Sequence, residues 1–168
     1  MTIHTTHPFG DPDPDPARRL RGRLGGTVTL WTSGRDSDRA GLTVTSVLVV
    51  LGEPAHLLGL VDPDSSLADE VSSTGSAVVQ LLSWADRDLA EAFAGTAPAP
   101  GGLFQQASFV DTVWGPRLEA ATTWAGIRLT KAEDLGWSRV LTGVVEHVEI
   151  GEENDPLVHR RGRWVRWV

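Results

Sequence analysis

Short stretches that alternate between apolar and polar residues, separated by turn residues, recur along this chain. Val28 and Leu30 alternate with their neighbours, and residues 42–47 alternate again before the chain becomes apolar up to residue 51. A period of two residues is typical of a strand. These patterns predict strands over residues 27–31, 42–51, 55–61, 77–82, 118–130, 140–150, 157–160 and 163–165, with tight turns at 34–38 and 161–162.

Signals for helix ends predict three short helices. Asp15 is placed to cap a helix that Pro16 begins and the glycine pair 25–26 ends. Ser66 has the capping-box spacing at the start of a second helix. A third helix is expected over residues 86–94.

Strands therefore outnumber helices. Six or more strands with a few short helices predict a mainly β fold, an antiparallel, Greek-key-like barrel with appended helices. The alternation of strand and helix that a doubly wound sheet requires is missing. The chain also lacks the dinucleotide fingerprint, the P-loop and the nucleophile elbow.

One domain accounts for most of the chain. Its 168 residues are typical of a single core, and we expect that domain to cover residues 15–168. Aspartate and proline alternate over residues 11–16, a composition that buries little surface. Residues 1–14 are therefore predicted to form a mobile arm.

Composition narrows the function. The chain has no cysteine, which excludes disulfides and thiolate metal sites, and it has no metal-binding histidine motif. Its net charge of −7 disfavours general binding to nucleic acid. No apolar run is long enough for a membrane helix, and no signal peptide is visible. We expect a cytoplasmic protein.

Several segments, taken in their order along the chain, resemble the flavin reductase-like family, whose fold is the FMN-binding split barrel. Residues 41–47 are similar to the family's Gly-Met-Thr-Val-Ser-Ser-Phe signature, and residues 156–164 are similar to its closing Pro-Leu-Val-Tyr-His-x-Gly-x-Tyr stretch. The other matching segments are 16–20, 26–32, 53–54, 61–66 and 93–95. The resemblance implies a homodimer with FMN or FAD near its interface. It also implies that NAD(P)H transfers a hydride to the flavin N5, with reduced flavin retained or passed to a partner monooxygenase.

The resemblance assigns the cofactor to two segments. The first is the predicted strand with Leu42, Thr43, Val44, Thr45 and Ser46, whose hydroxyls and backbone can bond the ribityl chain, the phosphate or the ring edge; threonine is also simply a good strand residue.

The second segment is the loop with Asp62, Ser65 and Ser66. A helix start suits a phosphate, but Ser66 also serves equally well as a plain cap. Asp62 and Asp64 add negative charge there. The compensating charge would have to come from elsewhere, with Arg117, Arg160, Arg161 and Arg163 as candidates.

Two further positions depart from the family pattern. Many members have Gly-Asp-His before the penultimate strand, with the histidine at the reaction site, where this chain has Gly136, Trp137 and Ser138. The closing Tyr-His becomes His159-Arg160. A nicotinamide-facing role falls to Ser138 or Trp137, and Trp137 or Trp164 is a candidate for stacking on the flavin. Hydride transfer depends on orientation, so we assign no general acid or base.

These departures leave two alternatives to a reductase. One is a flavin or deazaflavin binder without reductase activity. The other is a structural relative that has lost its cofactor.

Overall fold

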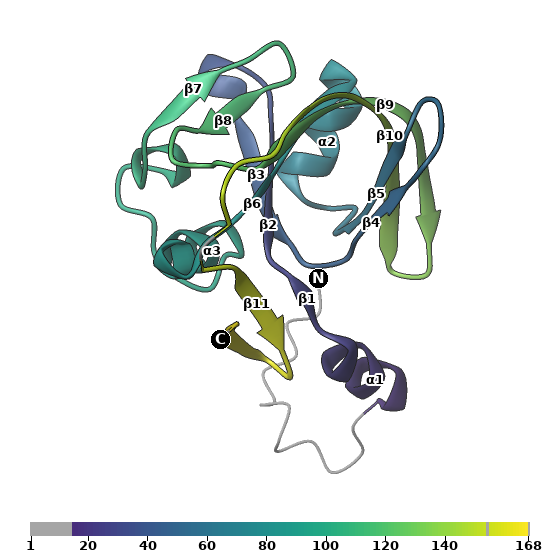
Figure 1. Ribbon diagram of the computed structural model, residues 1–168, viewed down its shortest axis with the longest axis vertical. Coiled ribbons are helices and arrows are strands. Elements are labelled where there is room, and N and C mark those ends of the chain that lie inside the picture. The colour runs from purple at the N-terminus through teal and green to yellow at the C-terminus, as the bar shows by residue number, and fades with distance from the viewer. Residues whose placement is uncertain (1–14, 154, 168) are drawn as a thin grey trace.

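A curled antiparallel sheet dominates the computed structural model, which describes residues 15–153 and 155–167. Seven strands pair in the order β3-β2-β6-β9-β10-β5-β4 and form a half-barrel with short helices around it, so the predicted fold class is confirmed (Figure 1). The predicted arm, residues 1–14, lies outside the described residues. The strands of this sheet are β2 Thr29–Ser33, β3 Ala40–Val44, β4 Val47–Val50, β5 His56–Val61, β6 Ser76–Leu81, β9 Trp124–Leu135 and β10 Ser138–Glu149.

Two smaller sheets and three α-helices complete the molecule. One small sheet has the order β1-β11-β12, with β1 Gly26–Thr27, β11 Leu157–Arg160 and β12 Arg163–Arg166. The other pairs β7 Phe109–Asp111 with β8 Pro116–Leu118. The helices are α1 Pro16–Leu24, α2 Ser66–Thr74 and α3 Arg87–Phe93, and the 3-10 turns are η1 Asp36–Asp38, η2 Trp84–Asp86 and η3 Leu103–Gln105. No described helix is long and apolar enough to cross a membrane.

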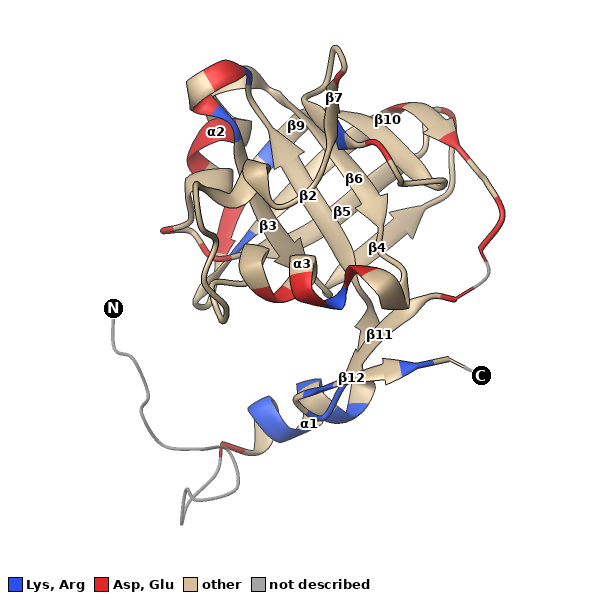
Figure 2. Cartoon of the chain, turned by 90° about the vertical axis from the view of Figure 1, so that its left-hand side faces the viewer, with Lys and Arg blue, Asp and Glu red and all other residues tan. Residues whose placement is uncertain are grey.

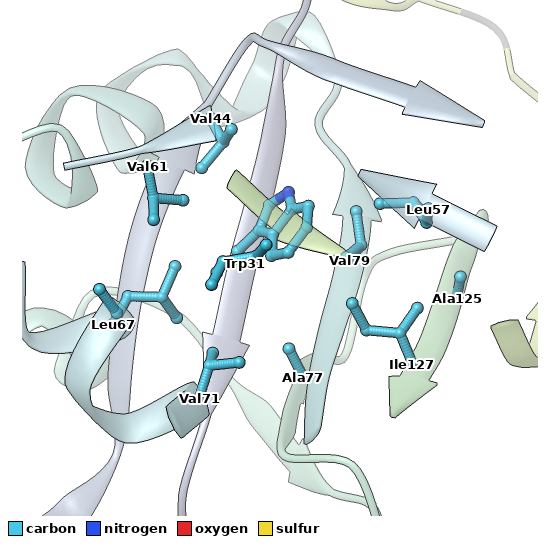
Figure 3. Packing of buried hydrophobic residues seen from close by; sticks show 12 residues of the cluster. Trp31, Val44, Leu57, Val61, Leu67, Val71, Ala77, Val79, Ala125 and Ile127 are labelled. Carbon is cyan, nitrogen blue, oxygen red and sulfur yellow. The ribbon is translucent and has the colours of Figure 1, made fainter. Parts of the chain in front are cut away.

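The interior of the half-barrel is filled by side chains. Trp31 is fully buried at its centre, surrounded by aliphatic residues of β3, β5, β6, β9 and α2 (Figure 3). A β-carbon on Gly59 would overlap the Trp31 ring, so only glycine lets the indole lie across the barrel there. Because this core is packed, a ligand has to bind at an end of the barrel or on its outside.

A second core lies on the other face of β2 and β6, beneath α3. Leu30 and Phe93 belong to it, with Leu157 from β11. Both faces of β2 are therefore buried, and all five of its residues are buried. The alternating pattern predicted this strand correctly but could not show that its two sides face two different cores.

Two predicted strands are interrupted. The strand expected over 42–51 breaks at Thr45 and Ser46, where β3 ends and β4 begins. The strand expected over 118–130 is two strands, because residues 119–123 turn between β8 and β9. Strand β7 was not predicted.

The predicted helix starts are confirmed with one change. The Asp15 side chain accepts a hydrogen bond from the Ala17 amide at 3.0 Å, as expected of the cap of α1. At α2 the cap is Ser65, whose Oγ accepts from the Ala68 amide at 3.2 Å. The prediction that Ser66 caps this helix is therefore wrong, since Ser66 is its first helical residue.

Candidate functional site

Three segments that are distant in sequence meet at one end of the barrel. The Leu60 amide donates to the Ser46 carbonyl at 3.0 Å, which joins the bend between β3 and β4 to the end of β5. Arg139, at the start of β10, pairs with Val61 at the same end of β5. The bend, the loop from β5 to α2 and the start of β10 are therefore neighbours, and they hold five of the twelve predicted cofactor residues, Thr45, Ser46, Asp62, Ser65 and Ser138.

The β3 part of the first predicted segment faces the two cores. Val44 is buried in the barrel core and Leu42 packs against it. The Thr43 hydroxyl donates to the Ala90 carbonyl of α3 at 2.7 Å. The expectation that Thr43, Thr45 and Ser46 share one strand is wrong, because the backbone leaves β3 after Val44.

The bend itself keeps its hydroxyls available. Thr45 and Ser46 are half-buried. Neither side-chain hydroxyl has a hydrogen-bond partner among residues 15–153 and 155–167, in contrast to Thr43. The bend also lies against β1, because a β-carbon on Gly26 would lie 2.5 Å from the Thr45 carbonyl oxygen. This segment therefore offers two hydroxyls at the surface beside a closely packed backbone.

The loop before α2 is held by its own hydrogen bonds. The Asp62 carboxylate accepts from the Asp64 amide at 2.9 Å, and the Ser65 hydroxyl donates to the Asp62 carbonyl at 2.6 Å. With its oxygen also accepting from Ala68, Ser65 is fully engaged in capping. Ser66 is exposed. The helix start is favourable for an anion, but Asp62, Asp64 and Asp69 surround it with negative charge.

One cation near this loop was missed from the sequence. Arg139 is half-buried, and its Nε lies 2.8 Å from Asp134 Oδ1 across the β9–β10 hairpin. This hydrogen bond raises the pKa of Arg139 and lowers that of Asp134, while Asp69 and Asp64 act on Arg139 from α2 and its loop. Arg139 lies near the loop before α2 because of the register between β5 and β10, and no local sequence motif predicts this position.

The other predicted counter-charges lie elsewhere. Arg117 donates to the carbonyl groups of Leu118, Glu119 and Ala121, and its guanidinium lies 5.4 Å from the Trp124 ring centre. It therefore holds the turn after β8. The arginines at 160, 161 and 163 belong to the C-terminal hairpin, on the β1 side of the bend.

Trp137 and Ser138 lie at the β9–β10 hairpin. Trp137 is at its tip and is 89% exposed, so its ring has no core to fill. Ser138 is half-buried and pairs with Leu135, next to Arg139. Ser138 thus borders the candidate site, whereas Trp137 projects into solvent.

His159 approaches the same bend from the other side. It pairs with Gly26 in the β1–β11 ladder, and its ring packs edge-on to Trp164 with the centres 4.9 Å apart. Burial lowers the pKa of His159, and the charge of Arg21 lowers it further. The neighbouring Arg160 is exposed, and its Nε donates to the Arg23 carbonyl at 3.2 Å.

Comparison with known proteins shows similarity to flavin reductases. The model of the flavin reductase like domain matches residues 21–167. The chain is 32% identical over 143 residues to an FMN reductase (NADH) RutF from Stutzerimonas stutzeri, which covers 84% of this chain and 82% of that one. It is 26% identical over 144 residues to a 4-hydroxyphenylacetate 3-monooxygenase reductase component from Pseudomonas aeruginosa, covering 84% and 85% of the two chains.

Solved structures share the fold. An NADH:FAD oxidoreductase from Streptomyces globisporus, in complex with NAD and FAD fragments, superposes with a TM-score of 0.81 at 20% identity. The match covers 90% of this chain and 91% of that one. At this identity the likeness concerns the fold alone.

Proposed function

The chain belongs to the flavin reductase like domain family, and from this we propose that it is a cytoplasmic NAD(P)H-dependent reductase of FMN or FAD. The observation that carries the proposal is the end of the barrel where Thr45 and Ser46 meet the loop before α2, in a chain that matches the family model over residues 21–167. We propose that a single domain over residues 15–168 holds this activity.

The chemistry of the residues present fits a flavin. The free hydroxyls and backbone of Thr45 and Ser46 can bond the polar edge of the ring or the ribityl chain, and the exposed Ser66 can bond a phosphate. Ser138 and His159 border the bend on opposite sides and would contact the ring or the nicotinamide. Leu42, Thr43 and Val44 would contribute by fixing the position of the bend.

Bound flavin would supply the redox chemistry by accepting the two electrons and one proton of a hydride at N5. The residues of the chain would bind the flavin and orient it. Thr45 and Ser46, both half-buried, would hold the ring at this end of the barrel. Relatives include NADH-dependent FMN reductases and reductase components of monooxygenases. We propose that reduced flavin passes likewise to a partner oxygenase.

We also propose that the functional unit is a homodimer. Strand β4 is an edge of the main sheet, and Leu48, Val49 and Val50 on it are exposed. An exposed apolar edge strand is unfavourable in an isolated chain and favours pairing with another copy. Val49→Lys should give monomers in sedimentation velocity. Val113→Lys is the matched control, because Val113 is 72% exposed against 61% for Val49 and lies outside the main sheet.

The test of the activity is direct. Purified protein is mixed with FMN or FAD and then with NADH or NADPH without oxygen, while the absorbance bands of oxidised flavin and reduced nicotinamide are followed together. We expect both bands to fall at equal molar rates, far above the rate without protein. Unchanged bands with every pair of nucleotides would refute the reductase.

A second candidate is a flavin or deazaflavin binder without reductase activity. Ser138 favours this candidate, because many members of the flavin reductase-like family have histidine at the corresponding position. Flavin binding measured by fluorescence, without nicotinamide oxidation above background, would support this candidate. Binding of no flavin at all would leave the cofactor-free structural relative.

A further inference from the structure

Positive charge is concentrated at one end of the molecule. Eight of the fifteen lysines and arginines lie in α1 and the β11–β12 hairpin, which together we call the arginine arm (Figure 2). Residues 16–27 and 157–167 contain no acidic residue. Since the whole chain carries −7, the rest of it carries −15. The arginines of the arm are Arg18, Arg19, Arg21, Arg23, Arg160, Arg161, Arg163 and Arg166.

The arm is one structural unit. The Arg161 amide donates to the Gly22 carbonyl at 2.8 Å, and Arg160 donates to the Arg23 carbonyl, so α1 and the hairpin are tied together. All four arginines of α1 are exposed. Within the described part of the chain only Arg166 of the arm has an ion-pair partner, Asp155 at 2.8 Å. Guanidinium groups gathered in this way repel one another unless an anion lies among them.

The arm adjoins the candidate cofactor site. Its strand β1 touches the bend, because Gly26 lies against the Thr45 carbonyl. His159 of β11 pairs with Gly26, and Arg21 is close enough to influence the titration of His159. The cations of the arm therefore begin at the side of the bend opposite the acidic loop of Asp62 and Asp64.

We propose that the arginine arm binds the phosphate groups of the nucleotides that the protein uses, an inference that rests on the proposed function. FMN carries a phosphate, and FAD and NAD(P)H carry a pyrophosphate. The planar guanidinium group of arginine matches phosphate oxygens with two parallel hydrogen bonds. A molecule that is positive at one end and negative elsewhere also directs a negatively charged nucleotide toward that end. Ser66 at the start of α2 is the alternative phosphate contact, and the Asp62 and Asp64 carboxylates beside it favour the arm.

The experiment compares ligands with and without phosphate. Dissociation constants of FMN, FAD and riboflavin are measured by flavin fluorescence at low and high salt, and NAD⁺ is titrated into riboflavin-loaded protein. The variant replaces Arg18, Arg19, Arg21 and Arg23 with glutamine, which keeps helix propensity close to that of arginine. The control makes the same change at four cations outside the arm, Arg35, Arg87, Arg128 and Lys131. The thermal midpoint of each variant is recorded, and Arg21→Gln alone serves as a milder second variant.

We expect the arm variant to lose affinity for a phosphate-bearing ligand by on the order of tenfold or more, with riboflavin binding unchanged and the salt dependence reduced. A loss for FMN identifies the flavin phosphate as the ligand, and a loss confined to NAD⁺ identifies the dinucleotide pyrophosphate.

Several results would overturn the inference: equal affinities in the arm variant and the wild type, an equal loss for riboflavin, or an equal loss in the control. A change of oligomeric state with unchanged nucleotide affinity would also overturn it and would identify the arm as a protein contact. Reductase activity can survive all of these results, so failure of this inference is distinguishable from failure of the proposed function.

Discussion

Gly26 and Thr45 touch through their backbones, so that a β-carbon on Gly26 would lie 2.5 Å from the Thr45 carbonyl oxygen. That oxygen belongs to the main chain and cannot swing away. Gly26→Ala should therefore push β1 and the bend apart, lower the free energy of unfolding by about 1–3 kcal/mol and weaken flavin binding. Denaturant unfolding and a flavin titration measure the two effects.

Gly22→Ala is the matched control. A β-carbon on Gly22 would meet only the Arg161 Cα, at 3.8 Å, and alanine favours the helix. Its free energy of unfolding should rise by roughly 0.5–1 kcal/mol, with flavin affinity unchanged. Equal flavin affinity in both variants would show that β1 does not support the site.

Two threonines of the same segment should behave in opposite ways. Thr45→Val removes a hydroxyl with no partner in the described part of the protein, so stability should hold while flavin affinity falls roughly three- to tenfold. Thr43→Val removes the donor to the Ala90 carbonyl and should cost about 1 kcal/mol of stability, with a smaller loss of flavin affinity than Thr45→Val. The reverse outcome would place the cofactor on the α3 side of β3.

The two serines at the start of α2 can be separated in the same way. Ser65→Ala removes the cap and its bond to the Ala68 amide, so unfolding should become easier by about 1 kcal/mol. Ser66→Ala leaves every capping bond in place and should leave stability unchanged. If Ser66 contacts the phosphate, its loss weakens FMN binding more than riboflavin binding. Parallel titrations of the variant with FMN and riboflavin measure the two losses of affinity. Equal losses for the two flavins would contradict the contact.

Elements whose ends are set by neighbouring residues could be predicted from the sequence. Asp15, Pro16 and the glycines at 25 and 26 define α1 from neighbouring residues alone, and the structure has the same ends. The alternating stretches likewise gave most strands of the sheet, because burial on a sheet face repeats every two residues. At α2 the capping-box spacing pointed to Ser66, but the cap is its neighbour Ser65. The extended backbone of Ser65, with φ −73° and ψ 148°, selects it.

Features that depend on contacts between residues distant in the sequence could not be predicted from the sequence alone. No glycine or proline marks the break at Thr45 and Ser46. It results from closure of the barrel, where Ser46 accepts from Leu60. Arg139 reaches the candidate site only through the register of β10 on β5. The family resemblance pointed to a set of candidate residues, and the tertiary structure divides them between the cores and the surface.

The last prediction concerns pH. Burial, and then the charge of Arg21, lower the pKa of His159 in the folded protein from its ordinary value of 6.5. The unfolded chain therefore binds this proton more readily than the folded protein does, and the stability linked to His159 is complete above pH 6.5. As the pH falls below that value, the free energy of unfolding should decrease until the folded imidazole titrates too. His159→Gln should flatten this part of the stability curve. Arg21→Gln should raise the pKa of His159, measured by NMR titration of the imidazole protons, and narrow the affected pH range. An identical pH dependence in the wild type and His159→Gln would mean that other groups cause it.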